Sequence, residues 1–178
     1  NNFEILKDIS ERFDKIELPF MLTDSFAMSY YANPRMTRDL DFVIELDTNK
    51  IDSLVKVVEN DYIVSFEVIK ESFLHKSMFN LIHKESLIKV DCIIRKDEKY
   101  RKIEFDRRQK IKLRDFTTYI VSKEDLILSK CLWMKESYSE IPIRDVKNLL
   151  STGYDQNYLQ EYIKILGLEE LFKQRFNE

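Results

Sequence analysis

Three aspartates that could bind a divalent cation lie in stretches with the pattern of β-strands. Asp39 and Asp41 open one stretch, and Asp91 lies within a second, LIKVDCII. Alternate side chains of a strand point the same way, so Asp39 and Asp41 project from one face with Cα atoms about 6.6 Å apart. Neighbouring carboxylates repel one another but suit Mg²⁺, which prefers hard oxygen ligands and is completed by waters and substrate phosphates. The pair therefore indicates a metal site, with a solvated strand end as the alternative.

The segment before this pair has features of a phosphate-binding turn. A short apolar strand, Phe20 to Leu22, leads into a turn at Thr23-Asp24-Ser25, a helix that ends near Tyr31, and a loop that carries Arg35 and Arg38. Amides at a helix N-terminus bind anions, and the two arginines flank the approach to the aspartates. The strand that follows has an apolar face that a core would bury: Leu40, Phe42, Ile44 and Leu46.

These motifs together resemble those of a known superfamily. The turn with Ser25, the short helix, the run PRMTRDLD and a later hairpin ending in KVD are similar to the DNA polymerase β-type nucleotidyltransferases. Within that superfamily the likeness is greatest to bacterial proteins grouped with the abortive-infection, AbiEii-type toxins. The resemblance extends from about Leu18 to Leu150.

The resemblance implies a fold and a reaction. The fold would be α+β, a small mixed β-sheet flanked by helices with a helical C-terminal part. The reaction would transfer a nucleoside monophosphate from an NTP to an acceptor hydroxyl and release pyrophosphate. Asp39 and Asp41 would hold two Mg²⁺ ions, or Mn²⁺ in their place, and Asp91 would bind the catalytic ion and help to deprotonate the acceptor.

The resemblance also implies a set of nucleotide-binding residues. Ser25 and the turn amides would contact the β- and γ-phosphates, and Arg35 or Lys130 would neutralise them. Lys130 interrupts the apolar stripe of a helix, and a lysine there needs an anion or a route for its ammonium to reach water. The alternative is that Lys130 reaches solvent and that Arg144 and Asp145 are surface charges. The full expected set is Asp24, Ser25, Arg35, Thr37, Lys130, Arg144 and Asp145.

Asp24 departs from the pattern of the superfamily, which has glycine at this point of the turn. Glycine allows close backbone approach and a positive φ angle without steric cost, whereas a carboxylate repels phosphates. Three explanations fit: Asp24 is turned away as an N-cap, activity has been reduced, or the residue is an introduced substitution.

Periodicity predicts the remaining elements. We expect helices at Asn2 to Lys15, Ile51 to Val58 after an N-cap at Asp47-Thr48, Ser65 to Phe73, and Tyr100 to Gln109. We expect strands at Met78 to His83, Ser86 to Ile94, Ile111 to Leu113, and Tyr119 to Val121. The chain holds 2 glycines, so tight turns should use Asn, Asp and Ser, and a glycine-rich phosphate loop is excluded.

From Lys123 onward the sequence is helical in character. Ser122 with Asp125 forms a capping pattern, and Gly167 separates two terminal helices, Asp155 to Leu166 and Leu168 to Phe176. We therefore expect a nucleotidyltransferase core in residues 1–121 and a helical region packed on it in residues 122–178.

Composition narrows the class of protein. Hydrophobic residues make up 44% and charged residues 34% of the 178 residues, as in a soluble globular protein. No apolar run reaches the length of a membrane span, and the N-terminal residues lack a signal-peptide core. The lone cysteines, Cys92 and Cys131, suit core packing in a reducing compartment. These features favour a cytoplasmic protein without a membrane partner.

The expected partners are an NTP, an RNA, tRNA or protein acceptor, and an antitoxin protein. The net charge of −3 argues against a general DNA-coating protein, but ten Lys or Arg oppose four Asp or Glu from Arg95 to Arg114. This excess could face a polyanion, for example through Arg107, Arg108 and Lys110, or be the charged face of a solvated helix. A catalytically degenerate member that binds nucleotide, RNA or a protein partner is the alternative to an enzyme.

Overall fold

The computed structural model describes residues 2–32, 38–137 and 141–176. The chain divides into two compact units. A sheet unit comprises Asn1–Phe26 and Met36–Val121, and a helical unit comprises Ala27–Arg35 and Ser122–Glu178.

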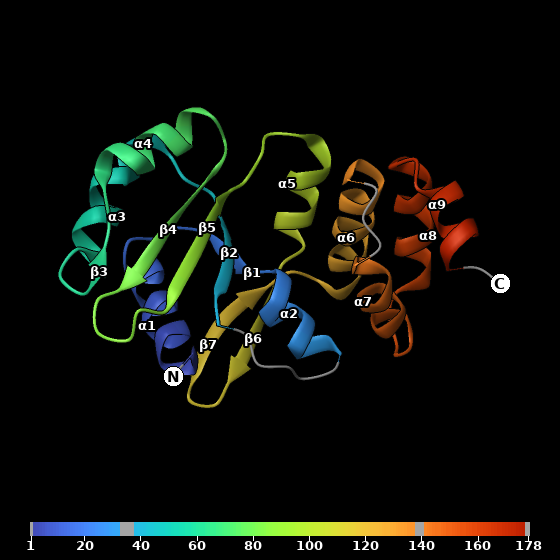
Figure 1. The fold of residues 1–178 in the computed structure, drawn as a ribbon, viewed down its shortest axis with the longest axis horizontal. Coiled ribbons are helices and arrows are strands. Elements are labelled where there is room, and N and C mark those ends of the chain that lie inside the picture. Colours follow the sequence, from blue (N-terminus) through green and yellow to red (C-terminus); the bar gives the residue numbers. More distant parts are fainter. Residues whose placement is uncertain (1, 33–37, 138–140, 177–178) are drawn as a thin grey trace. The chain divides into compact units, whose positions relative to one another are not determined.

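The sheet unit is built on a seven-stranded mixed sheet with the order β3-β4-β5-β2-β1-β7-β6 (Figure 1). β2 pairs in parallel with β5, and β1 with β7, whereas the remaining neighbours are antiparallel. The strands are β1 Phe20–Leu22, β2 Leu40–Ile44, β3 Tyr62–Ile63, β4 Met78–His83, β5 Lys89–Ile94, β6 Gln109–Leu113 and β7 Phe116–Ile120. The mixed α/β architecture confirms the expected fold class.

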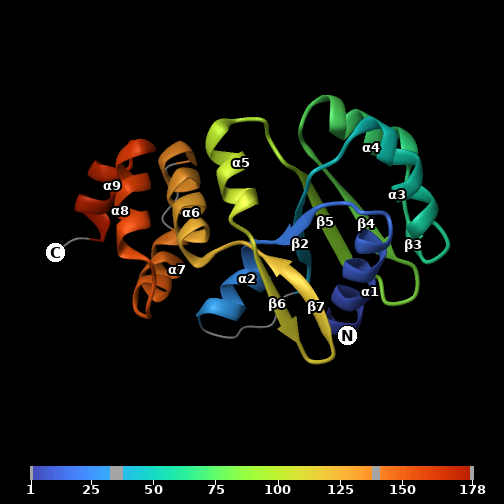
Figure 2. The same cartoon turned by 180° about the vertical axis from the view of Figure 1, so that it is seen from behind.

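Helices cover this sheet. They are α1 Asn2–Lys15, α3 Ile51–Val58 with the short 3₁₀ helix η1 Thr48–Lys50 before it, α4 Phe66–Leu74, and α5 Lys99–Asp106. α1 packs on one face of the sheet (Figures 1 and 2), where the ring of Phe13 lies edge-on to Phe20 and Phe42 at centroid distances of 5.5 and 5.7 Å. Ser10 of α1 also shares a buried 2.9 Å hydrogen bond with Thr118 of β7. This face is therefore the core side of the sheet.

Several element boundaries match the sequence prediction, and others correct it. α1 and β1 have the expected bounds, and Ser65 caps α4 by accepting a bond from the Val68 amide. α5 ends at Asp106 rather than Gln109, which begins β6 instead. Asp47 makes no side-chain cap, because η1 intervenes before α3. β5 begins at Lys89 rather than Ser86, since the turn continues through Leu87 at φ +62°.

The helical unit contains α6 Lys123–Ser137, α7 Ile141–Leu150, α8 Gln156–Ile165 and α9 Glu169–Arg175. At the start of α6 the Asp125 amide donates to Ser122 Oγ at 3.1 Å, which confirms the predicted cap. The buried Asp125 carboxylate also accepts a 2.6 Å bond from the Tyr158 hydroxyl, so α6 is tied to α8. Gly167, at φ +67°, ends α8 as expected.

One further helix begins in the sheet unit. α2 spans Asp24–Tyr31, and its residues from Ala27 onward group with the helical unit. No helix in the described part of the chain has the length and apolar character needed to cross a bilayer.

Candidate functional site

The register of the sheet brings two of the expected aspartates side by side. β2 and β5 run in parallel, and Asp41 is the pairing partner of Asp91. Paired residues on adjacent strands share a face. Phe42, the neighbour of Asp41, points to the core face and contacts Phe13 of α1, so the two carboxylates lie on the opposite face. The sheet thus separates the core from a carboxylate cluster.

Asp39 joins this cluster through a lysine that the sequence analysis did not assign to the site. Asp39 lies just before β2 and is partly exposed. The Nζ of Lys89 lies 3.7 Å from Asp39 Oδ2 and 3.6 Å from Asp91 Oδ1. Lys89 precedes Asp91 by two residues on the same strand. This spacing places both side chains on one face and was the signal in the sequence that could have assigned Lys89 to the site.

The electrostatics of Asp41 reflect a concentration of negative charge. Burial raises the pKa of Asp41 to about 7, and Asp24, Asp91 and Asp39 add to that rise by repelling its ionised form. A hydrogen bond between the Asp41 and Asp91 side chains favours the protonated form of Asp41 as well. A carboxyl group with this pKa is near the midpoint of its titration at neutral pH, and such groups cluster at functional sites.

Asp24 occupies a backbone conformation that favours glycine. Its φ angle is +49°, in the left-handed region that costs an ordinary L-residue about 1–2 kcal/mol. It is the first residue of α2 and is exposed, and the next residue, Ser25, is partly exposed. The turn therefore keeps the geometry of a glycine position while carrying a carboxylate.

The carboxylate cluster fits a divalent cation in its chemistry. Asp91 is 9% exposed, and its Oδ1 is a buried oxygen with no hydrogen-bond partner among the described residues. Such an acceptor is costly unless a cation or water reaches it. Within residues 2–32, 38–137 and 141–176, however, no three His, Cys, Asp or Glu side chains are already gathered as ligands of one ion. Lys89 is paired with two of the candidate ligands instead.

Three of the remaining expected site residues lie in the helical unit. Lys130 and Asp145 form a 3.2 Å ion pair between α6 and α7, with side chains 13% and 14% exposed, and Arg144 is exposed. Lys130 thus has an anion partner within the helical unit, and a contact with nucleotide stays a prediction. Arg35 and Thr37 lie outside the described residues.

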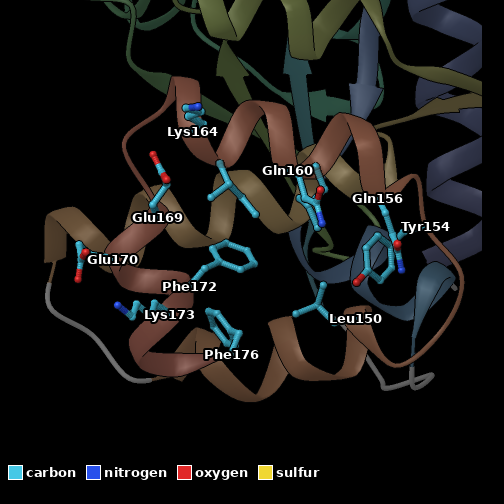
Figure 3. Close-up of a pocket in the computed structure, with 12 residues that line it drawn as sticks. Leu150, Tyr154, Gln156, Gln160, Lys164, Glu169, Glu170, Phe172, Lys173 and Phe176 are labelled. Atoms are coloured by element: carbon cyan, nitrogen blue, oxygen red, sulfur yellow. The ribbon is translucent and has the colours of Figure 1, made fainter. Parts of the chain in front are cut away.

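The helical unit also contains a pocket of about 800 Å³ formed by α8, α9 and the end of α7. Leu150, Phe172 and Phe176 line it together with Gln160 and Tyr154 (Figure 3). None of the expected site residues contributes to its wall. The residues that line the pocket are therefore different from those of the carboxylate cluster.

Comparison with solved structures identifies the fold. An antigenic nucleotidyltransferase-like protein from Paracoccidioides brasiliensis aligns with a TM-score of 0.61 at 18% identity, over 97% of this chain and 87% of that one. ANT(2'')-Ia in complex with adenylyl-2''-tobramycin gives 0.55 at 14% identity, over 98% and 97%. The lincosamide antibiotic adenylyltransferase LnuA, lincomycin-bound, gives 0.51 at 17% identity, over 84% and 94%.

Searches at the level of sequence do not extend this result. No protein-family model and no curated protein matches the chain. The similarity in structure shows that the chain has a nucleotidyltransferase fold.

Proposed function

We propose that this protein is a metal-dependent nucleotidyltransferase that transfers a nucleoside monophosphate from an NTP to an acceptor hydroxyl. The observation that carries the proposal is the pairing of Asp41 with Asp91 in the adjacent parallel strands β2 and β5, with Asp39 just before β2. Carboxylates so placed on a nucleotidyltransferase fold are the expected ligands of two Mg²⁺ ions.

The proposed reaction is an in-line displacement at the α-phosphorus. The acceptor oxygen bonds to that phosphorus, the bond to the bridging oxygen of the β-phosphate breaks, and pyrophosphate leaves. Bound Mg²⁺ would stabilise charge on the attacking and leaving oxygens. Asp39, Asp41 and Asp91 would hold it, and Asp91 would accept the hydroxyl proton. Ser25 and the amides that open α2 would orient the β- and γ-phosphates.

Two structural neighbours support adenylyl transfer as the reaction class. LnuA is described as an adenylyltransferase, and ANT(2'')-Ia was solved in complex with adenylyl-2''-tobramycin. We infer ATP as the first nucleotide to test. The finer assignment to AbiEii-type proteins, with an RNA, tRNA or protein acceptor and an antitoxin partner, rests on the sequence resemblance and is part of this proposal.

The experiment is transfer of label from each α-³²P NTP, with Mg²⁺, to total RNA and to a protein extract. Wild type should label one acceptor class, and Asp41→Asn and Asp91→Asn should each lose the activity by at least about 100-fold, because each removes an ion ligand. Asp52→Asn, an exposed change on α3, serves as the matched control and should keep full activity. Wild-type labelling by Asp41→Asn would refute the proposed roles.

The second candidate is a non-catalytic nucleotide-, RNA- or partner-binding protein, and Asp24 favours it. A carboxylate at the turn opposes the phosphates that the turn would otherwise bind. This candidate predicts that Asp24→Gly gains NTP binding and labelling that wild type lacks. Equal activity of wild type and Asp24→Gly would remove its support.

A further inference from the structure

Lys89 occupies a position that links two of the candidate metal ligands. It is the first residue of β5, where the register that pairs Leu40 with Val90 places it across from Asp39. Its Nζ lies 3.7 Å from Asp39 Oδ2 and 3.6 Å from Asp91 Oδ1. One ammonium group is therefore paired with carboxylates from both strands.

The charges around Lys89 favour a cation. Asp41 and Asp91 are paired in adjacent strands, and Asp39 lies one residue before β2, so three carboxylates share one region of the sheet unit. Carboxylates placed this close repel one another, and a nearby cation offsets that repulsion. Lys89 is the cation that the described residues place within 4 Å of both Asp39 and Asp91.

The ion pairs of Lys89 are long enough for its ammonium group to leave the two carboxylates. Both distances exceed that of a direct charge-assisted hydrogen bond, about 2.7–2.9 Å. The Lys89 side chain is 40% exposed and carries a flexible four-carbon stem, so its ammonium can move into water without opening the core. By contrast, Asp91 is fixed within the strand and buried.

We propose that Lys89 is a built-in counter-ion that holds Asp39 and Asp91 in the metal-free protein and competes with a divalent cation for the same carboxylates. The inference rests on the proposed function, because it takes the same aspartates as the metal site. An ion can use Asp39 and Asp91 together only after the ammonium of Lys89 has left them. Lys89 therefore sets the concentration of free cation at which the site fills.

This competition predicts opposite effects on stability and on affinity. Removing the ammonium leaves the carboxylates without a counter-charge, so the metal-free protein becomes less stable. The same change removes the competitor, so the cation binds more tightly. A lysine that acts only through long-range charge would alter the affinity in Lys89→Met but not in Lys89→Arg, which keeps the charge.

The test is a calorimetric titration of the protein with Mn²⁺ alone, without nucleotide. Lys89→Met keeps the length of the side chain and should lower the dissociation constant of Mn²⁺ about threefold to fivefold, the value of an exposed ion pair. Lys89→Arg keeps the charge and pairs more firmly with carboxylates, so it should weaken Mn²⁺ binding relative to wild type. Lys70→Met, an exposed change on α4, should leave the affinity unchanged.

Thermal unfolding of the same proteins supplies the second readout. In EDTA, Lys89→Met should have a lower melting temperature than wild type. Saturating Mn²⁺ should narrow or reverse this difference in melting temperature. Equal Mn²⁺ affinity of wild type and Lys89→Met would overturn the inference. An unchanged affinity of Lys89→Arg would also overturn it, because long-range charge alone would then explain the Lys89→Met effect.

The outcomes separate this inference from the proposed function. If Mn²⁺ affinity changes as expected in the Lys89 variants but wild type labels no acceptor, the role of Lys89 stands and the nucleotidyltransferase assignment is refuted. If wild type labels an acceptor but Lys89→Met binds Mn²⁺ as wild type does, the assignment stands and the role of Lys89 is refuted. A wild-type protein that binds no Mn²⁺ overturns the inference.

Discussion

Asp24 disfavours the folded state in two ways, through its backbone conformation and through its charge. Its left-handed conformation, at φ +49°, suits glycine, and its carboxylate raises the pKa of Asp41. Both effects are unfavourable to the folded state at neutral pH. Substitution of Asp24 can therefore test both effects.

We expect Asp24→Gly to stabilise the protein by about 0.5–1 kcal/mol, because glycine relieves the left-handed strain and removes a repelling charge. Unfolding in urea, followed by circular dichroism, measures the change. Asp24→Ala separates the two causes, since alanine removes the carboxylate but keeps the Cβ atom. If alanine stabilises as much as glycine, backbone strain is not the cause.

At the level of elements, the Lys130–Asp145 pair joins α6 to α7 within the helical unit. Both side chains are largely buried, at 13% and 14% exposure, and their charged atoms are 3.2 Å apart. Removing one partner of such a pair leaves a desolvated charge, which costs more than the pair itself contributes.

We expect Asp145→Asn and Lys130→Met each to reduce the free energy of unfolding by about 1–3 kcal/mol. The double variant should lose less than the sum, because neither charge is then left alone. A double-mutant cycle by chemical unfolding measures this coupling. Additive losses would show that the two side chains do not depend on one another.

The elements themselves were predictable where apolar periodicity is strong. The apolar stripe of α1 ends before Pro19, and its expected bounds, Asn2 to Lys15, agree with the structure. The alternation in β2 correctly predicted the buried face of Leu40, Phe42 and Ile44. Apolar periodicity follows directly from which side chains are buried, so these elements can be predicted from the sequence.

The turns were less predictable. With few glycines, we expected Asn, Asp and Ser to make the tight turns. Of the five non-glycine residues with positive φ in the described chain, Asp24 agrees with this expectation, whereas the others are Glu17, Lys76, Leu87 and Arg114. At Leu87 the left-handed conformation accompanies a 2.8 Å bond from the Leu87 amide to the His83 carbonyl, so the turn is longer and β5 begins later than predicted.

The position of Lys89 beside Asp39 was missed for another reason. Its contact with Asp39 depends on which strands pair, and that is a non-local property.

For the whole molecule, the raised pKa of Asp41 predicts a pH dependence of stability. Below its unfolded value of 3.8 the carboxyl is protonated in both states and has no effect. Between that value and about 7, the folded state keeps the proton that the unfolded state has lost, so stability falls as pH rises. Above about 7 the penalty is complete.

We therefore expect Asp41→Asn to gain stability relative to wild type as the pH is raised from 5 to 8, by about 1–2 kcal/mol after solvent screening is allowed for. Urea unfolding at several pH values in EDTA measures the difference. Asp52→Asn is the control and should show a constant offset. A constant offset for Asp41→Asn as well would mean that its carboxyl does not titrate in this range.

We propose that the paired aspartates form a nucleotide site that depends on a divalent cation. Calorimetric titration of each NTP with Mg²⁺ into wild type and Asp41→Asn tests it directly and needs no knowledge of the acceptor. We expect saturable binding of at least one NTP to wild type, lost without Mg²⁺ and lost in Asp41→Asn. Absence of binding for all four NTPs, or equal binding by both proteins, would contradict it.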